Sequence, residues 1–186
     1  MSNHPIGVVR AGPVQRILVA GSNVSELVVA AYNREDSAAH VLAFLRAHSD
    51  ELSLDLNSAA IVRVEDSGRF TVTTTAGPGA TGSAWSVLWS ALFDLVFLVP
   101  TPGRAYGPSL GGVFGLLDRA GLDADFCARI RAILVGGTSG LAFLAAHVDP
   151  EPALNHLAQR PSAIVRRVLS LEQDAELLQE LGGARP

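Results

Sequence analysis

The sequence contains no lysine, and all 14 of its basic residues are arginines. A lysine Schiff base, a P-loop lysine and a lysine general base are therefore excluded. The single cysteine, Cys127, excludes an intramolecular disulfide and any multi-cysteine metal site. Charged residues make up only 17% of the chain, and the formal net charge of −4 gives no basic surface for nucleic acid.

The chain does have enough apolar material for a substantial core. Its 186 residues are 48% hydrophobic, with a mean hydropathy of +0.30. A chain of this length folds without a metal or disulfide staple. The segment 1–22 holds short apolar runs around Gly12-Pro13 and is interpreted as an N-terminal arm, followed by a single domain over 23–183. Met1–Arg10 has no apolar stretch of signal-peptide length, so we expect a cytoplasmic location.

Apolar runs and alternating patterns predict a sheet of short strands joined by helices. Predicted strands lie at 26–32, 59–65, 69–75, 141–148 and 162–169, and predicted helices at 34–51, 150–159 and 171–181. Asn33 and Ser170 are expected to cap two of these helices, and Asp66-Ser67-Gly68 is expected to form a hairpin turn. Without the central block, the order predicts an α+β fold with a ferredoxin-like, split βαβ antiparallel sheet.

The composition changes abruptly at Ala76, where an apolar central block begins. It predicts an apolar helix over 84–99, a second helix over 109–119 ended by Gly121, and a third over 124–134 capped by Asp123. We interpret 77–121 as an inserted apolar, Gly-rich helical hairpin. Leaving an apolar sheet face in water costs about 25 cal/mol per Å². The hairpin, a second subunit, or both are therefore expected to cover the face that the crossover helices leave bare.

Several stretches resemble a bacterial family known as domain of unknown function 1269. They are LVVAAYNREDSAAHVLAFL, the Gly-rich helical block, GGTSGLAFLAAHV and VLSLEQDAELLQEL, and together they extend from Leu27 to about Leu181. Members are often described as predicted membrane proteins because their middle is apolar and Gly-rich. The resemblance implies no activity, cofactor or catalytic residue.

Aromatic residues recur every four positions in the first helix of the central block, and so lie along one side of it. They are Trp85, Trp89, Phe93 and Phe97. The first interpretation is that this row fills the space against the sheet. The alternatives are a subunit contact, a membrane-facing surface, or a ligand pocket that Asp94 and His147 help to line.

A second row, Gly107, Gly111 and Gly115, has the small-xxx-small spacing that lets another backbone approach closely. We expect the partner to be the first helix of the block or a second copy of the chain. The first helix, at 16 residues, is about 24 Å long, shorter than the roughly 30 Å of a bilayer core, and it contains Asp94. A packed hairpin is favoured over a membrane span, with contact at a membrane surface left open.

Other motifs have simpler interpretations than catalysis or cofactor binding. Gly77–Gly82 fits G-x-G-x-x-G, but no acidic residue follows where a ribose would need one, which favours a flexible loop over a dinucleotide site. The histidines lack metal-ligand spacing, so we expect no metal and no cofactor. The sequence therefore predicts a non-enzymatic protein that homo-oligomerises or docks a protein partner. The alternatives are a small-ligand or cofactor-binding sensor or enzyme, and a membrane-associated protein.

Overall fold

The structure, a computed structural model, describes residues 24–48, 58–76, 80–97, 115–146 and 160–170, together with 172, 173, 175, 176 and 179. Several predictions concern residues outside this part of the chain. They are the arm at 1–22, the first half of the loop at 77–82, the helix at 150–159, most of the helix at 109–119, and the residues Gly107, Gly111 and His147. The second half of that loop was predicted wrongly, because residues 80–82 are helical and belong to a helix that was expected to begin at 84.

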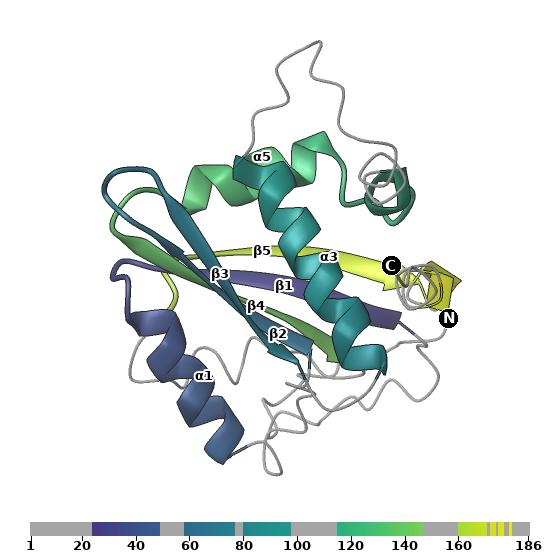
Figure 1. Cartoon of the computed structure of the whole chain (residues 1–186), viewed down its shortest axis with the longest axis horizontal. Coiled ribbons are helices and arrows are strands. Elements are labelled where there is room, and N and C mark those ends of the chain that lie inside the picture. Colours follow the sequence, from purple (N-terminus) through teal and green to yellow (C-terminus); the bar gives the residue numbers. More distant parts are fainter. Residues whose placement is uncertain are drawn as a thin grey trace, which may run out of the picture.

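The fold is α+β, built on a five-stranded antiparallel sheet (Figure 1). Its strands, in the order β3-β2-β4-β1-β5, are β1 Val24–Tyr32, β2 Ser58–Val64, β3 Phe70–Ala76, β4 Thr138–Ala146 and β5 Ala163–Ser170. All five predicted strands are present, and every neighbouring pair is antiparallel. The coarse architecture expected from the sequence is thus confirmed.

One strand begins earlier than predicted. The sequence placed its start at Leu141, but β4 begins at Thr138, because Thr138–Gly140 continue the ladder with β2. Gly140 therefore lies inside a strand. A Cβ on Gly140 would come within 2.8 Å of Val62 Cγ1 and 2.9 Å of Leu134 Cδ2, so only glycine leaves room for Leu134 to pack on the sheet at this position.

The first helix is shorter than predicted. Helix α1 spans Ser37–Ala47 rather than 34–51, and its N-cap is Asp36 rather than Asn33. The Asp36 side chain makes no capping hydrogen bond. The buried Ser139 of β4 caps the helix instead. Its Oγ accepts from the Ala38 N–H at 3.1 Å and donates to the Arg34 carbonyl. The start of α1 is therefore fixed by the sheet.

The predicted local stop and start signals are otherwise found where expected. Gly68 adopts a positive φ of 80° in the β2–β3 turn. Asp123 caps helix α5, Ala124–Ile133, by accepting from the Phe126 N–H at 2.9 Å. Ser170 Oγ accepts from the Gln173 N–H, while the Gln173 side chain accepts from the Ser170 N–H, which is a reciprocal capping box.

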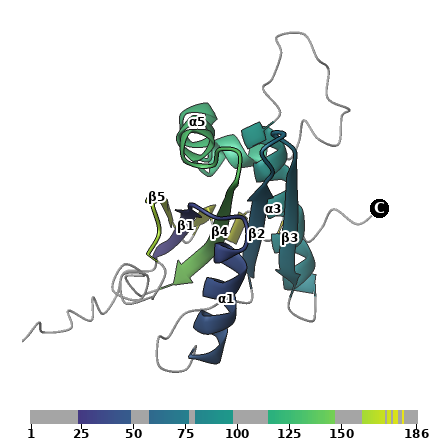
Figure 2. The ribbon, with the colours of Figure 1, turned by 90° about the vertical axis from the view of Figure 1, so that its left-hand side faces the viewer.

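Helices cover both faces of the sheet. Helix α1 packs on one face, where its buried side contacts residues such as Val28 and Phe143. Helices α3, Ala80–Phe97, and α5 pack on the other face. Figure 2 shows α3 beside β2 and β3 at one end of the sheet, with β5 at the other end. The face expected to need cover is thus covered in part by α3 and α5 of the same chain.

One polar group lies in the core on the α1 side without a hydrogen-bond partner. The Tyr32 side chain is fully buried, and no donor or acceptor among the described residues meets its hydroxyl. Burial raises the pKa of this phenol, which therefore stays neutral. A hydroxyl buried in this way opposes folding.

Replacing Tyr32 with phenylalanine should stabilise the protein. The change removes the unsatisfied oxygen but keeps the ring, so we expect the free energy of unfolding to rise by about 1 kcal/mol. Urea unfolding monitored by circular dichroism measures this. Tyr32→Ala is the control that removes the ring, and it should cost several kcal/mol. A Tyr32→Phe variant less stable than wild type would contradict the assignment of an unpartnered hydroxyl.

Candidate functional site

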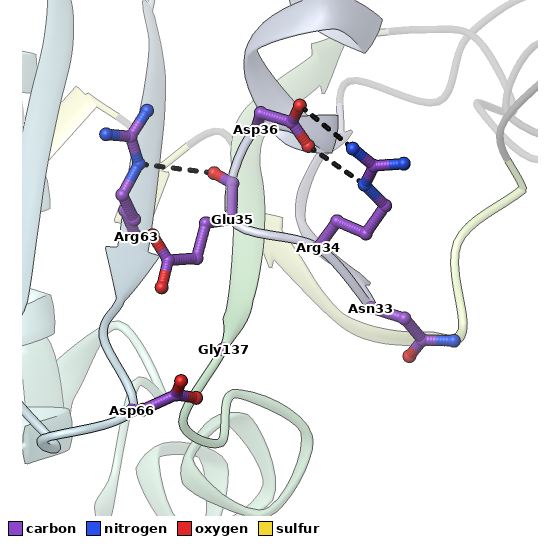
Figure 3. Close-up of a pocket in the computed structure, with 7 residues that line it drawn as sticks. All are labelled: Asn33, Arg34, Glu35, Asp36, Arg63, Asp66 and Gly137. Atoms are coloured by element: carbon purple, nitrogen blue, oxygen red, sulfur yellow. Dashed lines mark hydrogen bonds and ion pairs between the residues drawn. The ribbon is translucent and has the colours of Figure 1, made fainter.

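A polar cleft opens at the end of the sheet where β1 and β2 end and β4 begins. Its volume is about 600 Å³, and it is lined by Asn33, Arg34, Glu35, Asp36, Arg63, Asp66 and Gly137 (Figure 3). These residues come from the β1–α1 loop, the end of β2, the β2–β3 turn and the turn before β4. The topology therefore brings together three stretches that are far apart in the sequence, at 33–36, 63–66 and 137.

Some charged side chains of the cleft bond to other residues that line it. Arg34 Nε lies 3.3 Å from Asp36 Oδ1, and Arg63 Nε donates to the Glu35 carbonyl at 3.2 Å. Gly137 has a positive φ of 78°, and a Cβ there would come within 2.8 Å of Asp66 Oδ1. The glycine thus lets the β2–β3 turn close against the start of β4.

This chemistry suits a small polar ligand better than a metal or a covalent reaction. The lining holds two arginines and three carboxylates, but no cysteine, histidine or hydroxyl nucleophile. Among the described residues, no group of three or more His, Cys, Asp or Glu side chains could hold a metal ion. Sequence reasoning missed the cleft. Its one local signal was the polar run Asn33–Asp36 directly after a buried strand.

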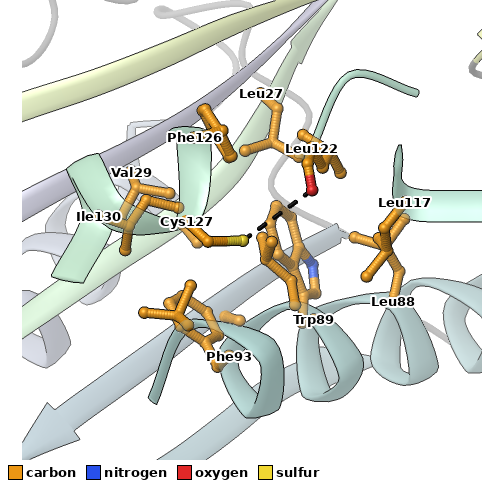
Figure 4. Close-up of a cluster of buried hydrophobic side chains, with 14 of the residues drawn as sticks. Leu27, Val29, Leu88, Trp89, Phe93, Leu117, Leu122, Phe126, Cys127 and Ile130 are labelled. Carbon is orange, nitrogen blue, oxygen red and sulfur yellow. Dashed lines mark hydrogen bonds between the residues drawn. The ribbon is translucent and has the colours of Figure 1, made fainter. Parts of the chain in front are cut away.

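The aromatic row of the central block lies on α3. Trp85, Trp89 and Phe93 are buried in the core between the sheet and α5, and the two indole rings lie 6.1 Å apart. Figure 4 shows Trp89 surrounded by apolar side chains, including Leu122 and Cys127. Phe97 is half-buried and stacks on Phe70 of β3 at 4.4 Å. These contacts fit the interpretation that the row fills the space against the sheet.

The other predicted pocket residues do not meet the tryptophans in the described part of the chain. At about 100° per residue, Asp94 lies about 140° around α3 from Trp89. Asp94 is half-exposed, and partial desolvation raises the pKa of its carboxyl. His147 lies outside the described residues. A pocket shared by these four residues stays a prediction.

Cys127 is a buried core thiol whose surroundings in the described part of the chain do not activate it. Its Sγ lies 3.9 Å from the Leu122 carbonyl oxygen, and burial raises the pKa of the thiol to about 11. The charge of the nearby Arg131 lowers this pKa only in part, and the Arg131 Nε donates to the Val96 carbonyl near the end of α3. The thiol therefore stays protonated at neutral pH, which is unsuitable for a nucleophile.

A second candidate surface is the outer side of α3. Ser90 is exposed and Val87 is 44% exposed. At about 100° per residue, Asp94 points in a direction between those of Val87 and Ser90, further along the helix. Asp94 is the only charged residue from Ala80 to Phe97. We call Val87, Ser90 and Asp94 the outer stripe of α3. Because it lies opposite the side that packs on α5, it faces away from the core.

Of the predicted glycine row, only Gly115 lies in the described part of the chain. Residues 115–119 are helical, and a Cβ on Gly115 would meet Arg119 Nη1 at 3.8 Å, an ordinary van der Waals contact. In the described part of the chain, no helix is long and apolar enough to cross a membrane.

A family model described as "Protein of unknown function (DUF1269)" matches residues 83–182, which include most of α3 and all of α5, β4 and β5. The match starts later than Leu27, where the resemblance in the sequence began. No curated protein and no solved structure matches the chain.

Proposed function

The chain belongs to the DUF1269 family, and we propose that this member is a non-enzymatic assembly protein that associates with further copies of itself or docks a protein partner. The contact surface includes the insert at 77–121, of which α3 and residues 115–121 lie in the described part of the chain. The outer stripe of α3 is the observation that carries the proposal.

Helix α3 carries less charge than is usual for a helix at the protein surface. A surface helix usually carries charged residues on its solvent side. Helix α3 has a single carboxylate, and Val87 of the outer stripe is 44% exposed. Covering this stripe with a second protein would remove apolar surface from water.

The strand order supports a ferredoxin-like arrangement beneath this surface. Strand β4 lies between β1 and β2 and is antiparallel to both, and β1 lies between β4 and β5 in the same way. Two split βαβ units have this order. In this proposal β3 is an additional edge strand, and the insert follows it.

Light scattering coupled to size-exclusion chromatography tests the proposal. We expect the full chain to have a mass above the 19.4 kDa of one copy. Val87→Glu should weaken self-association at least tenfold, because it places a charge in the buried contact. Val135→Glu is the matched control, since Val135 is 56% exposed and lies in the turn before β4. A wild-type chain that stays at 19.4 kDa at all concentrations would show that self-association is wrong.

The polar cleft supports a second candidate function, the binding of a small polar ligand. The guanidinium of Arg63 lines the cleft, and its Nε donates a hydrogen bond to the Glu35 carbonyl. Guanidinium groups recognise carboxylates and phosphates. Native mass spectrometry of the purified chain should then show a co-purifying anion that Arg63→Gln removes, whereas a bare chain argues against this function.

A further inference from the structure

The sheet has two edges, and they differ in how they are protected. The strand order places β3 at one edge and β5 at the other. Edge strands of natural proteins usually carry charged residues, prolines or bulges that prevent pairing with another chain. Strand β5 carries Arg166 and Arg167, which lie 3.8 Å from Glu26 and 3.9 Å from Asp123 respectively.

Strand β3 has none of these protections. Its sequence, FTVTTTA, contains no charged residue and no proline. Its pairing with β2 runs without a bulge through seven residue pairs, from Ser58↔Ala76 to Val64↔Phe70. In the described part of the chain, no further strand pairs with its outer side. An extended, uncharged edge rich in threonine is suited to pairing with another strand.

The strand is also complementary to itself. In an antiparallel pair of β3 strands related by a two-fold axis, the longest overlap is centred on Thr73. Thr73 then faces Thr73 of a second copy, and Thr71 faces Thr75. Cross-strand threonine pairs stabilise a sheet, whereas like charges directly opposite each other destabilise it. No charged side chain faces another within this overlap.

Helix α3 is placed to add to the same contact. It packs on β3 and β2, so it lies over this edge of the sheet (Figures 1 and 2). Neighbouring strands lie about 4.8 Å apart. Helices centred between β2 and β3 of each copy would cross about 10 Å apart, close to the 8–10 Å of packed helices. Both helices lie on the same face of the joined sheet, because opposite residues of antiparallel strands point to the same side.

We propose that the protein forms a homodimer in which β3 pairs antiparallel with β3 of a second copy, giving a continuous ten-stranded sheet with the two α3 helices in contact through Val87 across the two-fold axis and Asp94 at the rim of that contact. This inference rests on the proposed function and specifies its partner and its contact. It also accounts for the near absence of charge on α3.

A charge-swap experiment on Thr73 tests the pairing, because the two-fold axis makes this residue its own partner. Wild type should have twice the mass of one copy in light scattering and analytical ultracentrifugation. Thr73→Lys and Thr73→Glu should each raise the dimer dissociation constant at least tenfold, because each places like charges face to face. An equimolar mixture of the two should restore the dimer as a heterodimer. Thr73→Val is the control that keeps an uncharged strand, and it should remain dimeric.

The other outcomes separate this inference from the proposed function. If Thr73→Lys stays dimeric while Val87→Glu becomes monomeric, the α3 contact stands and β3 pairing is wrong. If Thr73→Lys and Thr73→Glu are each monomeric and their equimolar mixture forms no heterodimer, the two-fold register centred on Thr73 is wrong. If wild type is monomeric and its β3 amides still resist hydrogen exchange, another segment of the same chain must pair with the outer side of β3. That result would overturn the dimer. Circular dichroism of each variant confirms that it is folded.

Discussion

Replacing Trp89 with alanine should lower the free energy of unfolding by about 3–5 kcal/mol, the usual cost of removing a large aromatic side chain from a core. Trp89 is fully buried where α3 meets the sheet and α5, and its indole lies against the rings and branched side chains of that core (Figure 4). For a chain of this length, the loss corresponds to a fall in Tm of roughly 6–20 °C.

Urea unfolding monitored by far-ultraviolet circular dichroism measures the effect of Trp89→Ala. Phe44→Ala is the control, because Phe44 is also an aromatic residue on a helix but is 48% exposed. That change should cost less than about 1 kcal/mol. A similarly small loss for Trp89→Ala would mean that α3 is not packed against the sheet, and the fold described for the insert would be wrong.

The second large effect is expected from Ser139→Ala, which should cost about 1–3 kcal/mol. The Ser139 side chain is fully buried and bridges the Arg34 carbonyl and the Ala38 N–H at the start of α1. Alanine leaves both groups without this partner. The first turn of α1 should loosen before the rest of the chain unfolds.

Hydrogen exchange distinguishes this local effect from a general loss of stability. In Ser139→Ala, the Ala38 amide should exchange faster by a larger factor than amides in the middle of β1. Ser67→Ala is the control, because Ser67 is exposed and bonds only to groups in the β2–β3 turn. Equal acceleration of the α1 and β1 amides would show that Ser139 does not act as the cap of α1.

The sequence predicted the caps that are local and missed the one that is not. Asp123 and Ser170 each bond a backbone group three residues away, so the pattern of a few residues reveals them. The start of α1 depends on Ser139, which is 101 positions from Ala38. Its role follows from the pairing of β1 with β4, which no local pattern contains. The cleft was missed for the same reason.

The aromatic row shows a different limit of pattern reading. Residues four apart on a helix differ by about 40° in direction, so a row of four turns through about 120°. Trp85, Trp89 and Phe93 therefore point into the core, while Phe97 has turned toward β3 and stacks on Phe70. The periodicity predicted burial along the row, but the contact with an edge strand required the strand order.

Because Cys127 is buried, its reactivity reports on how often α5 separates from the rest of the core. The thiol lies on the buried side of α5, near Trp89 and Leu122 (Figure 4), and its pKa of about 11 keeps it protonated. A maleimide can reach it only when α5 separates from α3, so the labelling rate measures how often that separation occurs. Since the chain has no other cysteine, each labelling event reports on this one contact, without the need to introduce a probe.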